Sequence, residues 1–144
     1  MLSDSLVQMI EDHAEQLTRG LVDDLKSNKL TAHYHHLTRE ELHHRTYNVY
    51  RNLGHWIASE TEATIESAYT ALGKARHAEG IPLSEVVYAL ILVKYHLRVY
   101  VRFSGLSDSA IDLHREMELR QLVGQFFDKA IYYTVKGYEH AAAR

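Results

Sequence analysis

Residues 82–103 read PLSEVVYALILVKYHLRVYVRF, and this stretch dominates the expected fold. An uninterrupted apolar run covers residues 86–93, and apolar residues continue at helical spacing as far as Phe103. Pro82 stands where a helix tolerates proline, in its first turn. A helix that is apolar on nearly all sides is normally buried at the centre of its domain. We therefore predict a central apolar helix over residues 82–103, with the rest of the chain packed around it.

The remainder of the chain also has helical periodicity, and it contains one proline in 144 residues. A proline inside a helix costs about 3 kcal/mol, so this composition suits long helices. We expect four further helices: one ending near Ser27, one opened by the capping box Thr38–Glu41, one over 61–78 that stops at Gly80, and one over 119–135. No segment has the alternation of a strand. The predicted fold class is all-α, a single domain over residues 1–144 of about five helices.

Composition excludes several classes of protein. The net charge of −3 argues against a nucleic-acid binder, which needs a basic face. The absence of cysteine excludes disulfides, thiolate metal sites and a cysteine nucleophile. The apolar run at 86–93 is too short to cross a membrane, and the first residues have no secretory-signal pattern. A soluble, cytoplasmic protein is therefore expected, with no nucleic acid and no membrane among its partners.

Five histidines lie between residues 33 and 44, in a polar connection over residues 31–37 and the start of the helix after it. Glu40 and His43, like Glu41 and His44, have the Glu-x-x-His spacing that holds di-metal centres in helical bundles. Such a centre needs the motif on two helices, and no second copy occurs elsewhere in the sequence. We therefore predict a solvated polar segment and no metal site, with adventitious zinc or nickel binding as the alternative for this segment and a di-metal carboxylate enzyme as an alternative function.

Two other histidines fall on apolar helix faces. His13 lies between Ile10 and Leu17, and His96 projects among Leu92 and other apolar residues. A buried imidazole needs a hydrogen-bond partner, such as a backbone carbonyl or a tyrosine. It can instead be a haem ligand or a proton-linked switch, so the structural and the functional interpretation of these two histidines both stay open.

Arg76 is the third candidate for a ligand site. It shares a stripe with Leu72, and Glu79 follows one turn later, so an ion pair at the end of the helix is expected. The alternative is an anchor for a carboxylate ligand. His13, Arg76 and His96 together form the predicted ligand-binding set, with no catalytic residues assigned.

A basic stripe is also expected on the central helix. Lys94, Arg98 and Arg102 recur four residues apart and repel one another weakly. Acidic residues from another helix, or an acidic partner, are therefore expected beside them. The sequence contains no nucleophile elbow, phosphate-binding loop, dinucleotide-binding turn or zinc-protease helix, which argues against an enzyme.

Three segments together resemble a known family. They are LTREEL at 37–42, RHAEGIPLSEVVYAL at 76–90 and FFDKA at 126–130, of which residues 79–90 are the most specific. The arrangement is similar to the N-terminal sensory domain of RsbR/RsbRD-type proteins, the RsbT co-antagonists of the stressosome. The resemblance implies a helical, globin-like input module, commonly dimeric and generally without haem, which transmits a stress or ligand signal through its terminal helix.

These modules usually precede a STAS domain or a kinase, and no STAS residues follow here to match. Co-antagonist activity is therefore not carried over, and we expect a stand-alone sensor or an output partner on a separate chain. The predicted function is a non-catalytic bacterial signalling module, a homodimer without a cofactor, that senses a ligand or partner through helix repacking. The alternative is a haem- or tetrapyrrole-binding globin-like sensor with His96 or His13 as axial ligand.

Overall fold

The computed structural model describes residues 2–59, 61–103 and 110–143, with side chains at residue 8 and over 12–57, 61–100 and 117–143. Five α-helices and one 3₁₀ helix make up this part of the chain: α1 (Leu2–Ser27), η1 (Lys29–His36), α2 (Arg39–Ser59), α3 (Glu62–Ala78), α4 (Leu83–Phe103) and α5 (Ala110–Ala142). The described residues contain no strand, so the predicted all-α class is confirmed.

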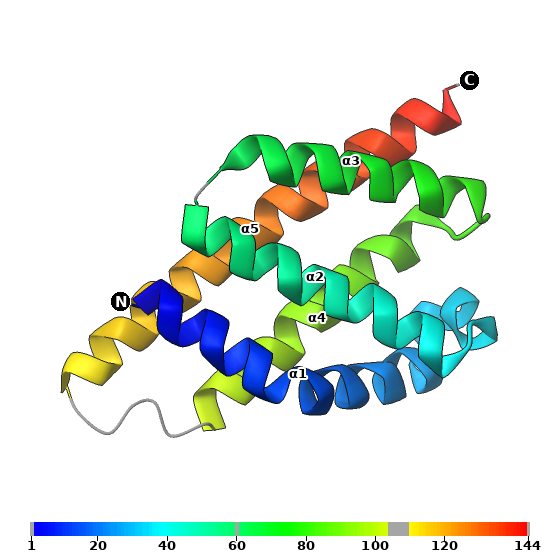
Figure 1. Ribbon diagram of the computed structural model, residues 1–144. Coiled ribbons are helices and arrows are strands. Elements are labelled where there is room, and N and C mark those ends of the chain that lie inside the picture. The colour runs from blue at the N-terminus through cyan, green and yellow to red at the C-terminus, as the bar shows by residue number, and fades with distance from the viewer. Residues whose placement is uncertain (1, 60, 104–109, 144) are drawn as a thin grey trace.

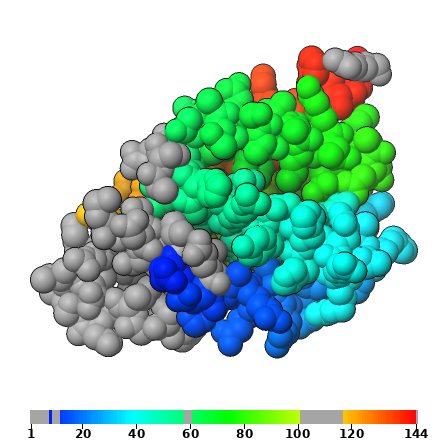
Figure 2. Space-filling view, viewed as in Figure 1, coloured from blue at the N-terminus to red at the C-terminus, as the bar shows by residue number. Residues whose placement is uncertain are grey.

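The helices form two closely packed pairs with α4 between them. α3 lies along α5, α1 lies against α2, and α4 contacts η1, α1, α3 and α5 (Figure 1). Figure 2 shows α2 at the surface between α1 and α3. α2 and α3 touch each other only sparsely, so the two pairs are joined mainly through α4.

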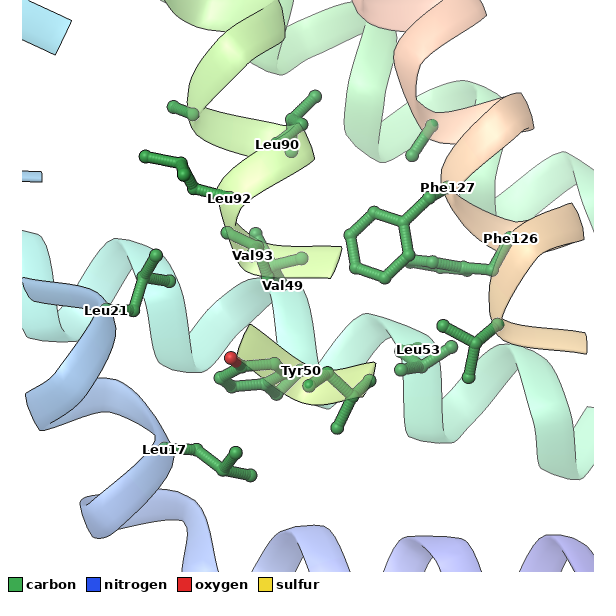
Figure 3. Close-up of a cluster of buried hydrophobic side chains, with 14 of the residues drawn as sticks. Leu17, Leu21, Val49, Tyr50, Leu53, Leu90, Leu92, Val93, Phe126 and Phe127 are labelled. Carbon is green, nitrogen blue, oxygen red and sulfur yellow. The ribbon is translucent and has the colours of Figure 1, made fainter. Parts of the chain in front are cut away.

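The core lies where α1, α2, α4 and α5 converge. Its largest side chains include Phe126 and Phe127 from α5, which face Val93 of α4 (Figure 3). The predicted apolar helix at 82–103 contributes Val86, Leu90, Val93 and Leu97 to this core, and all four are buried. One stripe of α4 stays at the surface, where Ile91 is 42% and Tyr95 59% exposed, because its neighbours do not enclose it on that side.

The turn between α3 and α4 is formed as its sequence indicates. Gly80 has a φ of 76°, the left-handed conformation that ends a helix and that glycine adopts without strain. The carbonyl of Pro82 accepts the N–H groups of Glu85 and Val86, so Pro82 stands directly before α4, one residue from the predicted start. These two residues confirm the predicted helix boundaries on both sides of the turn.

The segment over 31–37 differs from the polar connection that we expected, since most of it forms η1. The Thr31 hydroxyl donates to the Leu25 carbonyl at 2.9 Å. From α4, the Glu85 carboxylate accepts the backbone N–H of His33 at 2.7 Å and contacts its imidazole. Contacts with distant residues therefore hold these turns, and local sequence patterns do not report them.

The capping box at the start of α2 is half formed. The Thr38 hydroxyl accepts the backbone N–H of Glu41 at 3.1 Å, as predicted. The Glu41 carboxylate does not reach back, because it accepts a hydrogen bond from Arg45 at 2.9 Å instead.

Two glycines let α3 and α5 meet backbone to backbone. A Cβ atom on Gly73 would lie 2.1 Å from the carbonyl oxygen of Thr134, and one on Gly137 would lie 2.1 Å from that of Thr70. Real side chains do not approach so closely, so any larger residue would force the helices apart. Beyond this crossing, the Tyr138 hydroxyl donates to the Ile81 carbonyl at 2.6 Å and fixes α5 to the turn before α4.

We expect Gly73→Ala and Gly137→Ala each to lower the free energy of unfolding by about 3 kcal/mol or more, because the backbones must separate. Gly124→Ala is the matched control, since a Cβ there meets nothing within 4 Å. It should raise stability by up to about 1 kcal/mol through helix propensity. Urea unfolding followed by circular dichroism measures all three. Equal effects of Gly73→Ala and Gly124→Ala would contradict the close crossing.

The hydroxyl of Tyr50 is buried and has no hydrogen-bond partner among the described residues, and burial raises its pKa. We expect Tyr50→Phe to leave stability unchanged or to raise it by about 1 kcal/mol, since a buried unpaired polar group is removed. Tyr138→Phe should lower stability by about 1 kcal/mol, because it deletes a formed hydrogen bond. A loss of stability for Tyr50→Phe as large as that for Tyr138→Phe would show that the Tyr50 hydroxyl is satisfied.

Candidate functional site

Two arginines from different helices converge on one carboxylate. Glu79, just after α3, accepts a hydrogen bond from Arg76 on one oxygen at 2.7 Å and from Arg45 of α2 on the other at 2.6 Å. The predicted ion pair between Arg76 and Glu79 is therefore present. Arg45, which sequence reasoning missed, extends it into a cluster that joins α2 to the end of α3.

Local structure positions each member of this cluster. Arg76 lies in the last turn of α3, where a positive charge interacts favourably with the helix dipole. Gly80 ends the helix directly after Glu79 and turns the chain toward α4. Arg45 stands one turn after Glu41, which it also binds.

The charges in this cluster stabilise one another. Burial alone lowers the pKa of the Arg45 guanidinium, but hydrogen bonds to Glu79 and Glu41 outweigh burial and raise that pKa. Burial alone raises the pKa of the Glu79 carboxyl, yet Arg45 and Arg76 outweigh it and hold the pKa below its ordinary value. Both groups are therefore charged at neutral pH.

A cavity of about 40 Å³ adjoins the cluster. Its polar lining consists of Tyr34, Arg45, Thr46 and Arg76, and the rest is leucine, valine and alanine from α1, α2, α3 and α4. Burial raises the pKa of Tyr34 to about 12, although Arg76 and Arg45 oppose the rise. The phenol is therefore neutral and can donate a hydrogen bond. Apolar walls with a few convergent polar groups are typical of small-molecule sites.

One donor of the cluster is unsatisfied. Nε of Arg45 binds Glu41 and Nη2 binds Glu79, but Nη1 is buried and has no acceptor within the described part of the chain. A buried polar group without a partner costs about 1–3 kcal/mol, and more when it is charged. The lining of this cavity therefore includes a cationic side chain with an unused donor.

The structure separates the three residues of the predicted ligand set. Arg76 lines the cavity, whereas neither His13 nor His96 does. Both histidines lie between α1 and α4: the His13 ring packs on Tyr100 with centroids 5.3 Å apart, and Nε2 of His96 lies 2.8 Å from the Asp24 carboxylate. Both make interhelical contacts; Tyr100 is a partner of the kind expected for His13, whereas the Asp24 carboxylate beside His96 is neither the carbonyl nor the tyrosine that we expected.

The same contact bears on the haem alternative. Nε2 of His96 would have to leave Asp24 before it coordinated iron. In the histidine-rich segment, His33 contacts Glu85, and Nε2 of His35 lies 2.9 Å from the Asn28 carbonyl. Among the residues with described side chains, no three His, Cys, Asp or Glu gather closely enough to hold a metal ion. Neither the haem nor the di-metal alternative gains support here.

The basic stripe of α4 lies beside a wide surface cleft of about 400 Å³. Lys94 and Arg98 line it with Arg120 of α5 and the exposed Tyr95. No ion pair involves these three cations in the described regions, so the acidic neighbours expected from another helix are not found there. The side chain of Arg102 lies outside the described residues.

No known family model matches the chain, and no curated protein or solved structure is significantly similar to it. The resemblance to RsbR-type sensory domains therefore stays a prediction from the sequence. None of the described helices combines the length and apolar character needed to cross a bilayer.

The lowered pKa of Glu79 predicts a pH dependence of stability. Its folded pKa lies below the ordinary 4.5, so its contribution is complete above that value and is lost as pH falls through the folded pKa. Glu79→Gln should lower the stability at pH 7 and flatten its decline as the pH falls below about 5. Glu15→Gln, at a side chain 80% exposed, is the control. Identical pH profiles for wild type and Glu79→Gln, from urea unfolding, would contradict the cluster.

Proposed function

We propose that this protein is a non-catalytic sensory module of bacterial signalling, in which occupation of the cavity changes how the two helix pairs pack. One observation carries this proposal: the cavity lies where both pairs, α4 and η1 meet, beside a buried cation with an unused donor. The likeness of residues 37–42, 76–90 and 126–130 to RsbR-type input domains supports the same function.

The link between the pairs is sparse at this point, which makes it sensitive to a ligand. Arg45 of α2 and Glu79 at the end of α3 are joined by an ion pair beside the cavity. A ligand that interacts differently with two arrangements of these helices shifts the balance between them. A ligand in this cavity would therefore change the position of α2 relative to α3.

α5 is the element that carries such a change away from the cavity. Its backbone is in contact with α3 at Gly73 and Gly137, so a shift of α3 moves α5 with it. α5 is also the longest described helix, with 33 residues, and it runs to the C-terminal end of the chain in Figure 1. Glu139 and His140 near its end are exposed. Transmission through the terminal helix is what the family resemblance implies.

The proposal includes a homodimer in the cytoplasm and a separate output protein. Large exposed apolar side chains on the outer faces of α4 and α5 support an interface of this kind: Ile91 at 42%, Tyr95 at 59% and Tyr132 at 56% exposure. Tyrosine is enriched where proteins associate.

Filling the cavity with a side chain tests the mechanism without a known ligand. Ala89 lines the cavity, and Ala89→Leu adds three carbons to it. The chain has no cysteine, so Arg51→Cys on α2 and Lys136→Cys on α5, both exposed, give two unique sites for spin labels. We expect Ala89→Leu to shift the label-to-label distance measured by double electron–electron resonance, because the pairs repack.

Ala71→Leu, at an exposed position of α3, is the matched control and should leave the distance unchanged. Ala89→Val serves if the leucine variant does not fold. A folded Ala89 variant whose distance distribution equals that of the parent would overturn sensing by helix repacking.

A further inference from the structure

We propose that the cavity binds a small monocarboxylate of three or four non-hydrogen atoms, such as formate or acetate, through Arg45 and Arg76. The inference rests on the proposed function for the choice of site and names the class of ligand. It depends on three properties of the cavity: its unused donors, its charge and its size.

The donors come first. A guanidinium has five N–H donors in a planar fork that matches the two oxygens of a carboxylate. Glu41 and Glu79 occupy Nε and Nη2 of Arg45, and its buried Nη1 has no acceptor among the described atoms. Arg76 and the neutral Tyr34 stand in the same wall. An anion beside Arg45 would supply the acceptor that Nη1 lacks.

The charge of the cluster favours an anion over a neutral ligand. The side chains of Arg45 and Arg76 are only 18% and 13% exposed, and the carboxylate between them, Glu79, is 30% exposed. The second carboxylate, Glu41, is 47% exposed and therefore better screened by water. The four charges sum to zero, but the two guanidiniums are the least exposed of the four groups, so an anion on the buried side meets positive charge first.

The size of the cavity selects a short molecule. One water-sized sphere needs about 10–15 Å³ on this measure, so about 40 Å³ holds three or four non-hydrogen atoms. Formate and acetate have that size, whereas longer fatty acids and phosphate exceed it. Val86, Ala89 and Leu90 line the apolar side, where a methyl group is favourable and a chain of waters would lack partners.

Binding would compete with an internal carboxylate. Glu79 already holds one donor from each arginine, so a bound carboxylate must share both guanidiniums with it. Glu79→Gln removes this competing charge and leaves both guanidiniums in place. The variant should therefore bind the ligand more tightly than wild type, which a purely structural role for Glu79 would not produce.

The test is saturation-transfer-difference NMR on acetate and on formate, titrated at constant ionic strength with chloride. Four atoms can reach a Kd on the order of 0.05 mM at best, so binding in the millimolar range is expected. We expect Glu79→Gln to lower the acetate Kd about fivefold or more, and Ala89→Leu, which fills the cavity, to abolish the signal. Arg39→Gln, which removes a surface charge of α2 paired with Asp23, should leave the Kd unchanged.

Three results would overturn the ligand class. They are no saturation transfer with either wild type or Glu79→Gln, an undiminished signal in folded Ala89→Leu, and displacement of acetate by equimolar chloride.

The ligand proposal and the sensing proposal can fail independently of each other. Acetate that binds without moving the Arg51→Cys and Lys136→Cys labels refutes sensing by repacking and leaves the ligand standing. Labels that move in Ala89→Leu while no carboxylate binds refute the ligand and leave sensing standing.

Discussion

Direct contact between the backbones of α3 and α5 is the constraint on which the rest of the structure depends. At Gly73 and Gly137 each helix lies where a Cβ of the other would be, so neither can rotate or slide without a clash. This places Tyr138 against the Ile81 carbonyl and fixes the turn that starts α4. The end of α3, with Arg76 and Glu79, is thereby held in one position relative to the core.

The second constraint is electrostatic and links the two helix pairs. Arg45 and Arg76 are both mostly buried, and a guanidinium removed from water must replace the hydrogen bonds that water made. Glu79 supplies one acceptor to each, and Glu41 supplies another to Arg45. Nη1 of Arg45 has no acceptor among the described residues, so the hydrogen bonds between the two helix pairs are incomplete. Such a junction is more easily shifted by a ligand than a fully paired one.

These two constraints assign different roles to the two sides of the molecule. α3 and α5 are packed backbone to backbone because Gly73 and Gly137 have no side chains to hold the two helices apart. α2 meets α3 sparsely beside a cavity, so its position there depends on one ion pair and on what fills the space. A rigid pair beside a sparsely packed junction is the physical basis of the sensing that we propose.

The part of the site that could be predicted is the part that is local in sequence. Arg76 and Glu79 are three residues apart at the end of α3, where Glu79 caps the helix, so their ion pair follows from helical geometry. Arg45 and Glu79 are 34 residues apart, and no spacing rule connects them. The spacing of apolar residues assigned His13 and His96 to apolar helix faces, and both are half-buried between α1 and α4. Their partners, Tyr100 and Asp24, became identifiable only once α1 and α4 were packed together.

The amino-acid sequence by itself determined the all-α class and several helix ends, such as those at Gly80 and Pro82, and also the buried face of residues 82–103. The spacing of apolar residues, the capping residues and the backbone preferences of glycine and proline act over only a few residues. The helices that they specify can therefore be predicted without knowledge of the tertiary structure. Only the tertiary structure decided that Gly73 and Gly137 are contact points, that Arg45 reaches Glu79, and that a cavity remains beside them. Each depends on the separation of helices distant in sequence, which the packing of the whole core sets.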